Sequence, residues 1–223
     1  MPLLLNRDMV ASLLTMSECI EAVEKAFAEL AAGTAVLPLR TSLPSPGGIS
    51  LYMPAFLQGA NARACKAVAV FKGNPEKHRL PTTTGTILLQ DAPTGRVCCI
   101  MDGEYLTAVR TGAASGVATK HLARSHAGQT VGIFGAGVQA RMQLAAVREV
   151  RRLSRAFVYD IVPGAAERFA REMSSRLDLE VVAVDSAREA ARADIVCTAT
   201  SSSLPLFAGG EVREGAHVNG IGS

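Results

Sequence analysis

A glycine-rich segment in the second half of the chain has the spacing of a phosphate-binding turn. Gly135, Gly137 and Ala140 form the pattern GxGxxA between an apolar run, TVGIFG, and a helical pattern. In such a turn the first glycine permits a sharp bend, the second leaves room for a pyrophosphate, and the small third residue lets the helix pack closely on the strand. Amide groups at the start of the helix would then bind the phosphates. A glycine turn without function is the alternative interpretation.

An acidic residue stands where a dinucleotide-binding fold needs one. Asp160 ends the apolar run AFVYD, 25 residues after Gly135. A carboxylate at this position accepts hydrogen bonds from ribose hydroxyls and repels a 2′-phosphate, and the next residues, IVP, include no arginine that could hold such a phosphate. The sequence therefore predicts NAD(H) as the preferred cofactor, with NADP(H) also possible. A plain turn residue at the surface is the alternative for Asp160.

Three positive side chains in the first half lie within apolar segments. They are Arg40 in LPLRTSL, Lys66 in ACKAVAVF and Arg110 in LTAVRTGAAS. Because a buried cation is costly without a partner, each needs a carboxylate of the protein or of a ligand. For any one of them, an internal ion pair fits the sequence as well as a substrate site. Together they would form an anion pocket in which the arginines could bind a carboxylate through two parallel hydrogen bonds.

The first half reads as an α+β domain. The spacing of apolar residues predicts a helix over 15–33 and another over 105–123, the second rich in alanine and glycine. Between them, runs bounded by proline and glycine predict strands of a mostly antiparallel sheet. These strands cover residues 36–43, 49–53, 65–71, 83–90 and 96–101. The polar segment 124–129 gives a domain boundary, with domains over 1–125 and 126–223.

The second half alternates strands and helices. Apolar strands joined by helices are typical of a doubly wound parallel sheet of the Rossmann type, so the fold class is α/β. Thr200 ends the fourth strand and is therefore expected at the carboxyl edge of the sheet, where ligands bind. The predicted strands are 130–135, 156–160, 180–184, 194–200 and 217–222, and the predicted helices are 139–150, 164–177 and 186–193.

The composition excludes several classes of protein. With 48% hydrophobic and 19% charged residues among 223, the chain can bury a large core, which excludes an intrinsically disordered protein. The net charge of +3 comes from 23 basic and 20 acidic residues, so we expect no nucleic-acid partner. No apolar run reaches the roughly 18 residues of a membrane helix, so we expect no membrane partner either.

The cysteines and histidines indicate a reduced protein without a metal. Five cysteines, an odd number without a CxxC pair, are typical of a cytoplasmic protein. The four histidines show no zinc-like spacing, so we expect no metal site.

Several segments occur in an order that is specific as a set. RTSLP, LYMPA, CKAVAVFKGNP, LPT, LLQDAPTG, LTAVRTGAAS, GAGVQA and HVNGIGS follow one another along the chain. In this order the sequence resembles the ornithine cyclodeaminase/mu-crystallin family over essentially its whole length. The resemblance implies a homodimer whose subunits have a dimerising substrate domain followed by a Rossmann domain. It also implies nicotinamide chemistry at the Cα–N bond of an amino or imino acid.

The resemblance also implies roles for individual residues. Arg40, Lys66 and Arg110 match the family positions that hold the substrate carboxylate. The positions near the cofactor that match are Thr82, Val138, Gln139, Asp160, Ile221, Gly222 and Ser223.

Two departures from the family pattern bear on activity. Leu51, two residues before the Met-Pro pair, replaces a glutamate that helps receive the second amine of ornithine in the cyclodeaminases. This favours an NAD(P)H-dependent reductase of a small α-imino acid, of the ketimine or pyrroline-2-carboxylate type. The alternatives are an ornithine cyclodeaminase, which forms proline and ammonia, and a non-catalytic NAD(P)H-binding protein like the crystallins.

The second departure lies at the end of the sequence. The chain stops at Ser223, before the aspartate that acts as the family's acid/base and before the last strands of its Rossmann sheet. We therefore assign no catalytic residue and expect an incomplete sheet and impaired turnover, since general acid-base catalysis contributes about 10²- to 10⁴-fold. His78, in the loop GNPEKHRLP, is interpreted as a solvated residue rather than as a proton donor.

Overall fold

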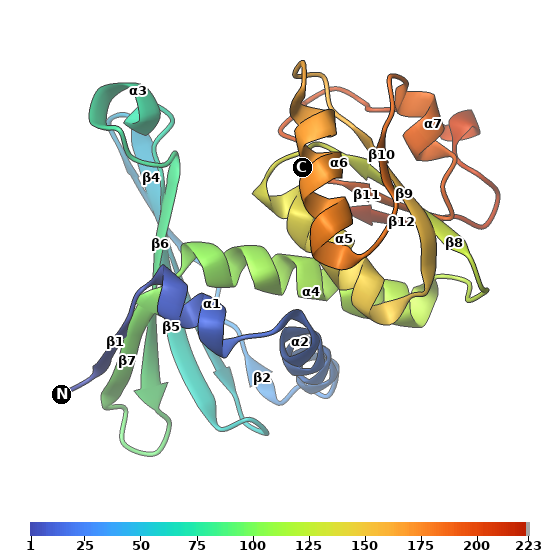
Figure 1. Cartoon of the computed structure of the whole chain (residues 1–223). Helices are drawn as coiled ribbons and strands as arrows, with labels where there is room; N and C mark the ends of the chain where they lie inside the picture. The colour runs from blue at the N-terminus through green and yellow to red at the C-terminus, as the bar shows by residue number, and fades with distance from the viewer. Residues whose placement is uncertain (222–223) are drawn as a thin grey trace. The chain divides into compact units, whose positions relative to one another are not determined.

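The computed structural model describes residues 1–221 and contains two compact units (Figure 1). Unit 1 consists of residues 1–15 and 21–107, and unit 2 of residues 16–20 and those from Ala108 onward. The division falls within two helices, α2 (Met16–Ala31) and α4 (Glu104–Leu122), so each of these helices contributes to both units.

Unit 1 is built on a sheet with the strand order β1-β7-β6-β5-β4-β2, in which β3 also pairs with β4. All neighbouring strands are antiparallel except β1 and β7, which confirms the predicted antiparallel character. The strands are β1 (Leu3–Leu5), β2 (Ala35–Val36), β3 (Thr41–Ser45), β4 (Gly48–Leu57), β5 (Ala62–Val70), β6 (Thr83–Asp91) and β7 (Val97–Asp102).

The segment expected as one strand over 36–43 is two short strands. β2 pairs with Phe56 and Leu57 of β4, whereas β3 pairs with the other end of the same strand. The intervening residues, which include Pro38, belong to neither strand. Proline lacks an N–H group for the ladder, which gives a physical reason for the interruption.

Short helices complete unit 1. In α1 (Arg7–Leu13) the Asn6 side chain caps the first turn by accepting a hydrogen bond from the Met9 N–H, at 2.9 Å. Helix α3 (Asn74–His78) lies between β5 and β6. The Glu29 carboxylate of α2 accepts hydrogen bonds from the N–H groups of Gly59 and Ala60, at 2.8 and 3.1 Å, and so holds the turn between β4 and β5.

Unit 2 contains an all-parallel sheet with the strand order β10-β9-β8-β11-β12 (Figure 1). The chain proceeds outward from β8 in one direction and then, from β11, in the other, which is the order of a Rossmann-type fold. The prediction of a doubly wound parallel sheet is confirmed. The strands are β8 (Gln129–Phe134), β9 (Leu153–Tyr159), β10 (Val181–Ala183), β11 (Ile195–Thr198) and β12 (His217–Gly220).

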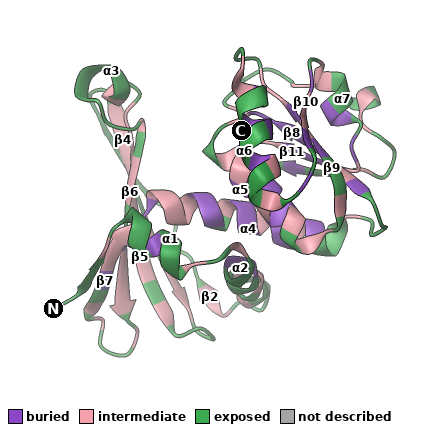
Figure 2. Ribbon diagram, in the orientation of Figure 1, coloured by how far each residue is buried: buried purple, intermediate pink, exposed green. Residues whose placement is uncertain are grey.

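Helices cover both faces of this sheet. Helices α5 (Val138–Val150) and α6 (Ala165–Leu177) bury one face in a core that includes Ile133 and Phe169, each fully buried. Helix α7 (Ala187–Ala191) covers the other face over Phe134. Figure 2 shows the buried residues concentrated on the sheet and on the helix sides that pack against it. A 3₁₀ turn (Gly209–Glu211) precedes β12.

Helix α4 packs tightly on α5 through small residues. A Cβ atom at Gly112 would lie 2.5 Å from the Met142 carbonyl oxygen, and one at Gly116 would lie 3.3 Å from the Ala146 Cβ. Most of α4 belongs to unit 2. The domain boundary predicted after residue 125 stays a prediction. In the part of the chain that the structure describes, no helix has both the length and the apolar character to cross a membrane.

Asp194 links the amino ends of the adjacent strands β8 and β11 of unit 2. Its carboxylate accepts hydrogen bonds from the N–H and the hydroxyl of Thr130, at 2.8 and 2.9 Å, and from Arg213 Nη1 at 2.7 Å. Burial raises the pKa of the Asp194 carboxyl, but the bonds from Thr130 and the positive charges of Arg213 and His126 outweigh burial and bring the pKa below its ordinary value.

This pKa shift predicts a pH dependence of stability. Because the folded-state pKa lies below the unfolded-state value, the stabilisation is complete above the unfolded pKa and is lost as pH falls through the folded pKa. We expect Asp194→Asn to lower the free energy of unfolding at pH 7 by about 1–3 kcal/mol and to flatten its decline as the pH falls below about 5. Urea denaturation of both proteins across this range measures the difference. Parallel curves for the two proteins would contradict the assignment.

Candidate functional site

A pocket of about 430 Å³ lies in unit 2, at the carboxyl ends of β8, β9 and β11. This edge includes the point between β8 and β11 where the strand order reverses, which is where open α/β sheets bind ligands. The residues from three separate loops that line the pocket include Gly135, Ala136, Gly137, Asp160, Val162 and Thr200.

The two glycines of the turn serve different needs. Gly135 has a φ of +94°, and a Cβ there would lie 2.5 Å from the Ala199 carbonyl oxygen, so the protein itself requires glycine. Gly137 has an ordinary φ of −85°, and no heavy atom lies within 4 Å of an added Cβ. The fold would therefore accept a side chain at Gly137, and the space in front of it is open for a ligand.

The first turn of α5 presents unused hydrogen-bond donors. Gly137 is the N-cap residue and supplies no side-chain cap. Among the described residues, none accepts a hydrogen bond from the N–H groups of Gly137, Val138 and Gln139. Converging N–H groups at the positive end of a helix dipole bind anions, phosphates in particular.

Asp160 is held at the rim of the pocket by the backbone. Its Oδ2 accepts a hydrogen bond from the Ala136 N–H at 2.7 Å, and its Oδ1 accepts one from the Val162 N–H at 2.8 Å. A carboxylate offers about four lone-pair positions, so acceptor capacity remains for hydroxyl donors of a ligand. The side chain thus has a fixed orientation and free capacity to bind a diol.

Arg141, which was not predicted from the sequence, holds the same loop through its backbone carbonyl groups. Its Nη1 donates to the carbonyl oxygens of Ala136, at 2.5 Å, and Gly137, at 3.1 Å, while Nε and Nη2 donate to the Glu172 carboxylate of α6. The hydrogen bonds from Arg141 lower the pKa of the Glu172 carboxyl. The available signal in the sequence was the spacing, since Arg141 follows Gly137 by four residues, about one helical turn. An arginine at this spacing is also common on the surface of a helix.

The other residues expected near the cofactor are distributed over both units. Thr200 lines the pocket and accepts a hydrogen bond from the Ser202 N–H at 3.3 Å. Gln139 lies in the first turn of α5, and Ile221 follows β12, with its N–H donating to the Thr198 carbonyl at 3.1 Å. Thr82 belongs to unit 1, next to β6. Gly222 and Ser223, also expected near the cofactor, lie outside the described residues.

The three predicted carboxylate-binding cations come from both units. Arg40 directly precedes β3, and Lys66 lies in β5, where it pairs with Met53 and Ile87 of the adjacent strands. Arg110 lies on the part of α4 that belongs to unit 2. Burial raises the pKa of the nearby Cys19 thiol, and the positive charge of Arg110 partly offsets this rise. A joint contact of the three cations with one carboxylate stays a prediction.

Comparison with known proteins places the chain in a family. The sequence model of the ornithine cyclodeaminase/mu-crystallin family matches residues 2–223. The chain belongs to this family. The resemblance inferred from the ordered segments is therefore confirmed.

Named relatives are similar to this chain over nearly all of its length. An alanine dehydrogenase of Archaeoglobus fulgidus is 38% identical over 99% of this chain and 67% of its own length. The structure of Thermococcus litoralis Δ1-pyrroline-2-carboxylate reductase with NADH and L-proline has a TM-score of 0.92 and 48% identity, over 99% of this chain and 68% of that chain. An archaeal alanine dehydrogenase dimer with bound NAD has a TM-score of 0.90 and 36% identity, over 97% and 66% of the two chains. This chain thus spans about two thirds of their length.

The glycine geometry gives a prediction that separates folding from binding. We expect Gly137→Ala to keep the melting temperature of the free protein within about 2 °C of wild type, because the added methyl group meets no protein atom. The same change should weaken NADH binding about tenfold or more, because the methyl group occupies the space in front of the amides. Gly135→Ala should instead lower the melting temperature by several degrees.

Calorimetry of the free proteins and NADH fluorescence titration measure the two effects. Unchanged NADH affinity in a folded Gly137→Ala protein would show that the dinucleotide does not bind at this turn.

Proposed function

We propose that this chain binds NAD(H) in the pocket of unit 2 and forms part of an NAD(P)H-dependent reductase that acts on a small α-imino acid. The observation that carries the proposal is the joint geometry of three unused amides at the start of α5 and a carboxylate fixed beside them. Amides and carboxylate match the pyrophosphate and the ribose diol of a dinucleotide. The relative solved with NADH and L-proline supports both the cofactor and the substrate class.

Each part of the cofactor has a counterpart in the pocket. The N–H groups of Gly137 and Val138 would bind the pyrophosphate, and Asp160 the ribose next to adenine. Ile161 and Val162, which are 84% and 56% exposed, offer apolar surface to the adenine ring. When bound, the reduced nicotinamide supplies the hydride that converts a C=N bond to CH–NH.

The substrate carboxylate is assigned to Arg40, Lys66 and Arg110. Holding the carboxylate would position the imine carbon for reduction and fix the orientation of the substrate. The imine nitrogen also needs a proton. We assign this proton to no residue of the chain, and His78 lies in α3 as an exposed side chain.

Leu51 favours a substrate without a second ammonium group. It lies in β4, where its neighbours in register are Ser42 and Val68. None of the three carries a charge that could pair with an ammonium. A small cyclic or acyclic imino acid therefore fits better than ornithine.

The alternative within the family is a cyclodeaminase, which oxidises and then reduces the same molecule. It would form proline and ammonia from ornithine with catalytic NAD and no net change in NADH. A third candidate, a protein that binds NAD(P)H without turnover, predicts NADH binding together with neither reaction.

Substrate assays distinguish these candidates and test the cations. We expect slow NADH oxidation with Δ1-pyrroline-2-carboxylate, because turnover is expected to be impaired, and a KM for this substrate raised about a hundredfold in Lys66→Met, since a lost charge-assisted contact costs roughly 2–3 kcal/mol. Lys25→Met, an exposed lysine on α2, serves as the matched control and should keep the wild-type KM. Proline formation from ornithine without net NADH change would replace the reductase by the cyclodeaminase.

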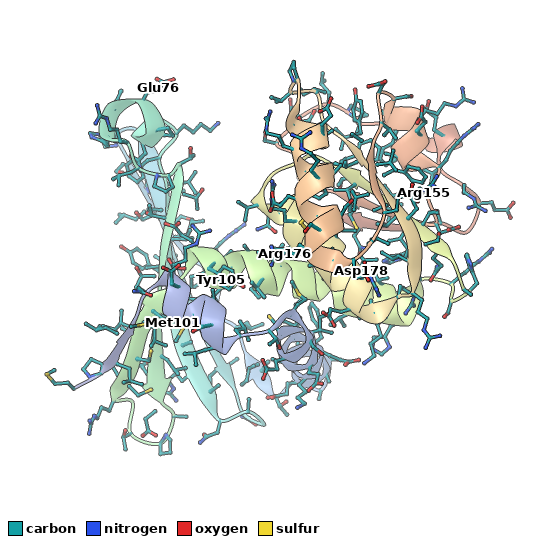
Figure 3. The ribbon with its side chains drawn as sticks, in the orientation of Figure 1. Glu76, Met101, Tyr105, Arg155, Arg176 and Asp178 are labelled. Carbon is teal, nitrogen blue, oxygen red and sulfur yellow. The ribbon has the colours of Figure 1, made fainter. Side chains whose placement is uncertain are left out.

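Asp160 should determine the choice between NADH and NADPH. We expect wild type to bind NADH at least about tenfold more tightly than NADPH, because the carboxylate attracts the ribose hydroxyls and repels a 2′-phosphate. Asp160→Asn should weaken NADH and reduce this ratio. Asp178→Asn is the control, because Asp178 follows α6 at the opposite, amino edge of the sheet (Figure 3). Equal affinities of wild type for the two cofactors, by fluorescence titration, would overturn the preference.

We further propose that the chain forms a homodimer through unit 1. Large apolar side chains are exposed on this unit, among them Leu39, at 95% exposure, and Leu43, at 55%. Exposed apolar surface of this kind is typical of protein interfaces. The alanine dehydrogenase relative described as a dimer supports this proposal. The cysteine pattern is the basis for proposing the cytoplasm as its location.

A further inference from the structure

We propose that Arg141 is a positioning residue that orients the phosphate-binding amides of the α5 turn, an inference that rests on the proposed binding of a dinucleotide there. Among the described residues, Arg141 has no hydrogen bond or ion pair with Asp160 or with the residues assigned above to the substrate, and its partners lie in the turn and in α6. Its guanidinium instead binds two successive carbonyl groups of the turn, those of Ala136 and Gly137, through one nitrogen.

Peptide geometry converts this contact into control of the amides. The chain contains no cis peptide bonds among its described residues, and in a trans peptide the C=O and N–H groups point in opposite directions. The carbonyl of Ala136 belongs to the same peptide unit as the N–H of Gly137, and the carbonyl of Gly137 to that of Val138. By holding both carbonyls on its own side, Arg141 directs both N–H groups away from itself. These are the N–H groups that no described residue accepts.

Arg141 is itself held by contacts with α6. Its Nε donates to Glu172 at 2.9 Å and its Nη2 donates to the same carboxylate at 2.6 Å. The guanidinium carbon also lies 5.2 Å from the centre of the Phe169 ring, within range of a cation–π contact. Two elements of the core, α5 and α6, therefore fix the group that orients the turn.

Most of the hydrogen-bonding capacity of Arg141 is already used within the protein, which favours an indirect role over a direct phosphate contact. An arginine has five N–H donors, and the bonds to Glu172, Ala136 and Gly137 use four of them, leaving one N–H of Nη2. Its charge is balanced by the Glu172 carboxylate, at 2.6 Å. Arg141 thus acts on a ligand through the backbone. It also polarises the two peptide groups, because a carbonyl bound to a cation makes the N–H of the same peptide a stronger donor.

The test compares ligands with and without a pyrophosphate. We expect Arg141→Met to raise the dissociation constants of NADH and ADP-ribose about tenfold, which corresponds to about 1.4 kcal/mol, while that of adenosine stays unchanged. Arg141→Lys should restore part of the affinity, because an ammonium reaches a carbonyl but lacks the planar fork. Fluorescence titration measures NADH, calorimetry ADP-ribose, and NMR titration adenosine.

A second ion pair in the same unit provides the matched control. Arg155 in β9 (Figure 3) donates to Glu180 through Nε at 2.8 Å and lies 2.7 Å from it through Nη2, but it is near the amino ends of β9 and β10. Arg155→Met should leave the affinities for all three ligands at wild-type values. Equal NADH affinity in Arg141→Met and Arg155→Met would overturn the proposal. So would a parallel loss of NADH and adenosine affinity, because it would show a general loss of structure.

A readout without any ligand separates this inference from the proposed function. In the free protein, ¹⁵N relaxation should show increased motion of the Gly137 and Val138 amides in Arg141→Met and not in Arg155→Met. If wild type failed to bind NADH, the dinucleotide proposal would fall, while the relaxation data would still decide whether Arg141 orders the turn. Unchanged relaxation at both amides would reject the positioning role.

Discussion

The close approach of two backbones at the end of β8 sets the geometry of the pocket. The Gly135 N–H donates to the Tyr159 carbonyl at 2.8 Å, and the Ala199 N–H donates to the Phe134 carbonyl at 2.9 Å, so both neighbouring strands hold β8 up to its last residue. Only glycine allows the chain to leave this position, with a φ of +94° and the Ala199 carbonyl in front of it. The turn is therefore short, and α5 begins with its free amides at the sheet edge.

The two edges of the unit 2 sheet differ in whether their backbone N–H groups have acceptors within the protein. At the amino edge, the Asp194 carboxylate takes the N–H of Thr130 and leaves this donor satisfied within the protein. At the carboxyl edge, Asp160 takes the Ala136 N–H, while the next three amides have no acceptor among the described residues. Unsatisfied donors are costly when buried, so they persist where water or a ligand can reach them. The first edge serves stability, and the second is the edge at which we propose that the cofactor binds.

The sequence permitted good prediction of elements whose signals are local. Every strand and α-helix of unit 2 was expected near its observed position, because apolar periodicity and glycine turns act over a few residues, whereas the 3₁₀ turn Gly209–Glu211 was not expected. The three-residue strand β1 and the helix α1 were not expected, and Asn74–His78, expected as part of a loop, forms helix α3, since so short a segment carries almost no periodicity. Non-local pairs were also beyond reach. Arg141 and Glu172 are 31 residues apart, and nothing in their local sequence distinguishes them from a surface pair such as Arg155 and Glu180.

The proposed function assigns cofactor binding and substrate choice to different kinds of group. Backbone amides recognise a pyrophosphate by geometry and carry no information about the other reactant. Substrate choice must then come from side chains such as the one at Leu51, where Ser42 and Val68 are its neighbours in register. A second ammonium placed there would lose its hydration without gaining a carboxylate, and such a loss costs several kcal/mol. In the substrate site that we propose, leucine at position 51 therefore favours a simple imino acid over a diamino acid.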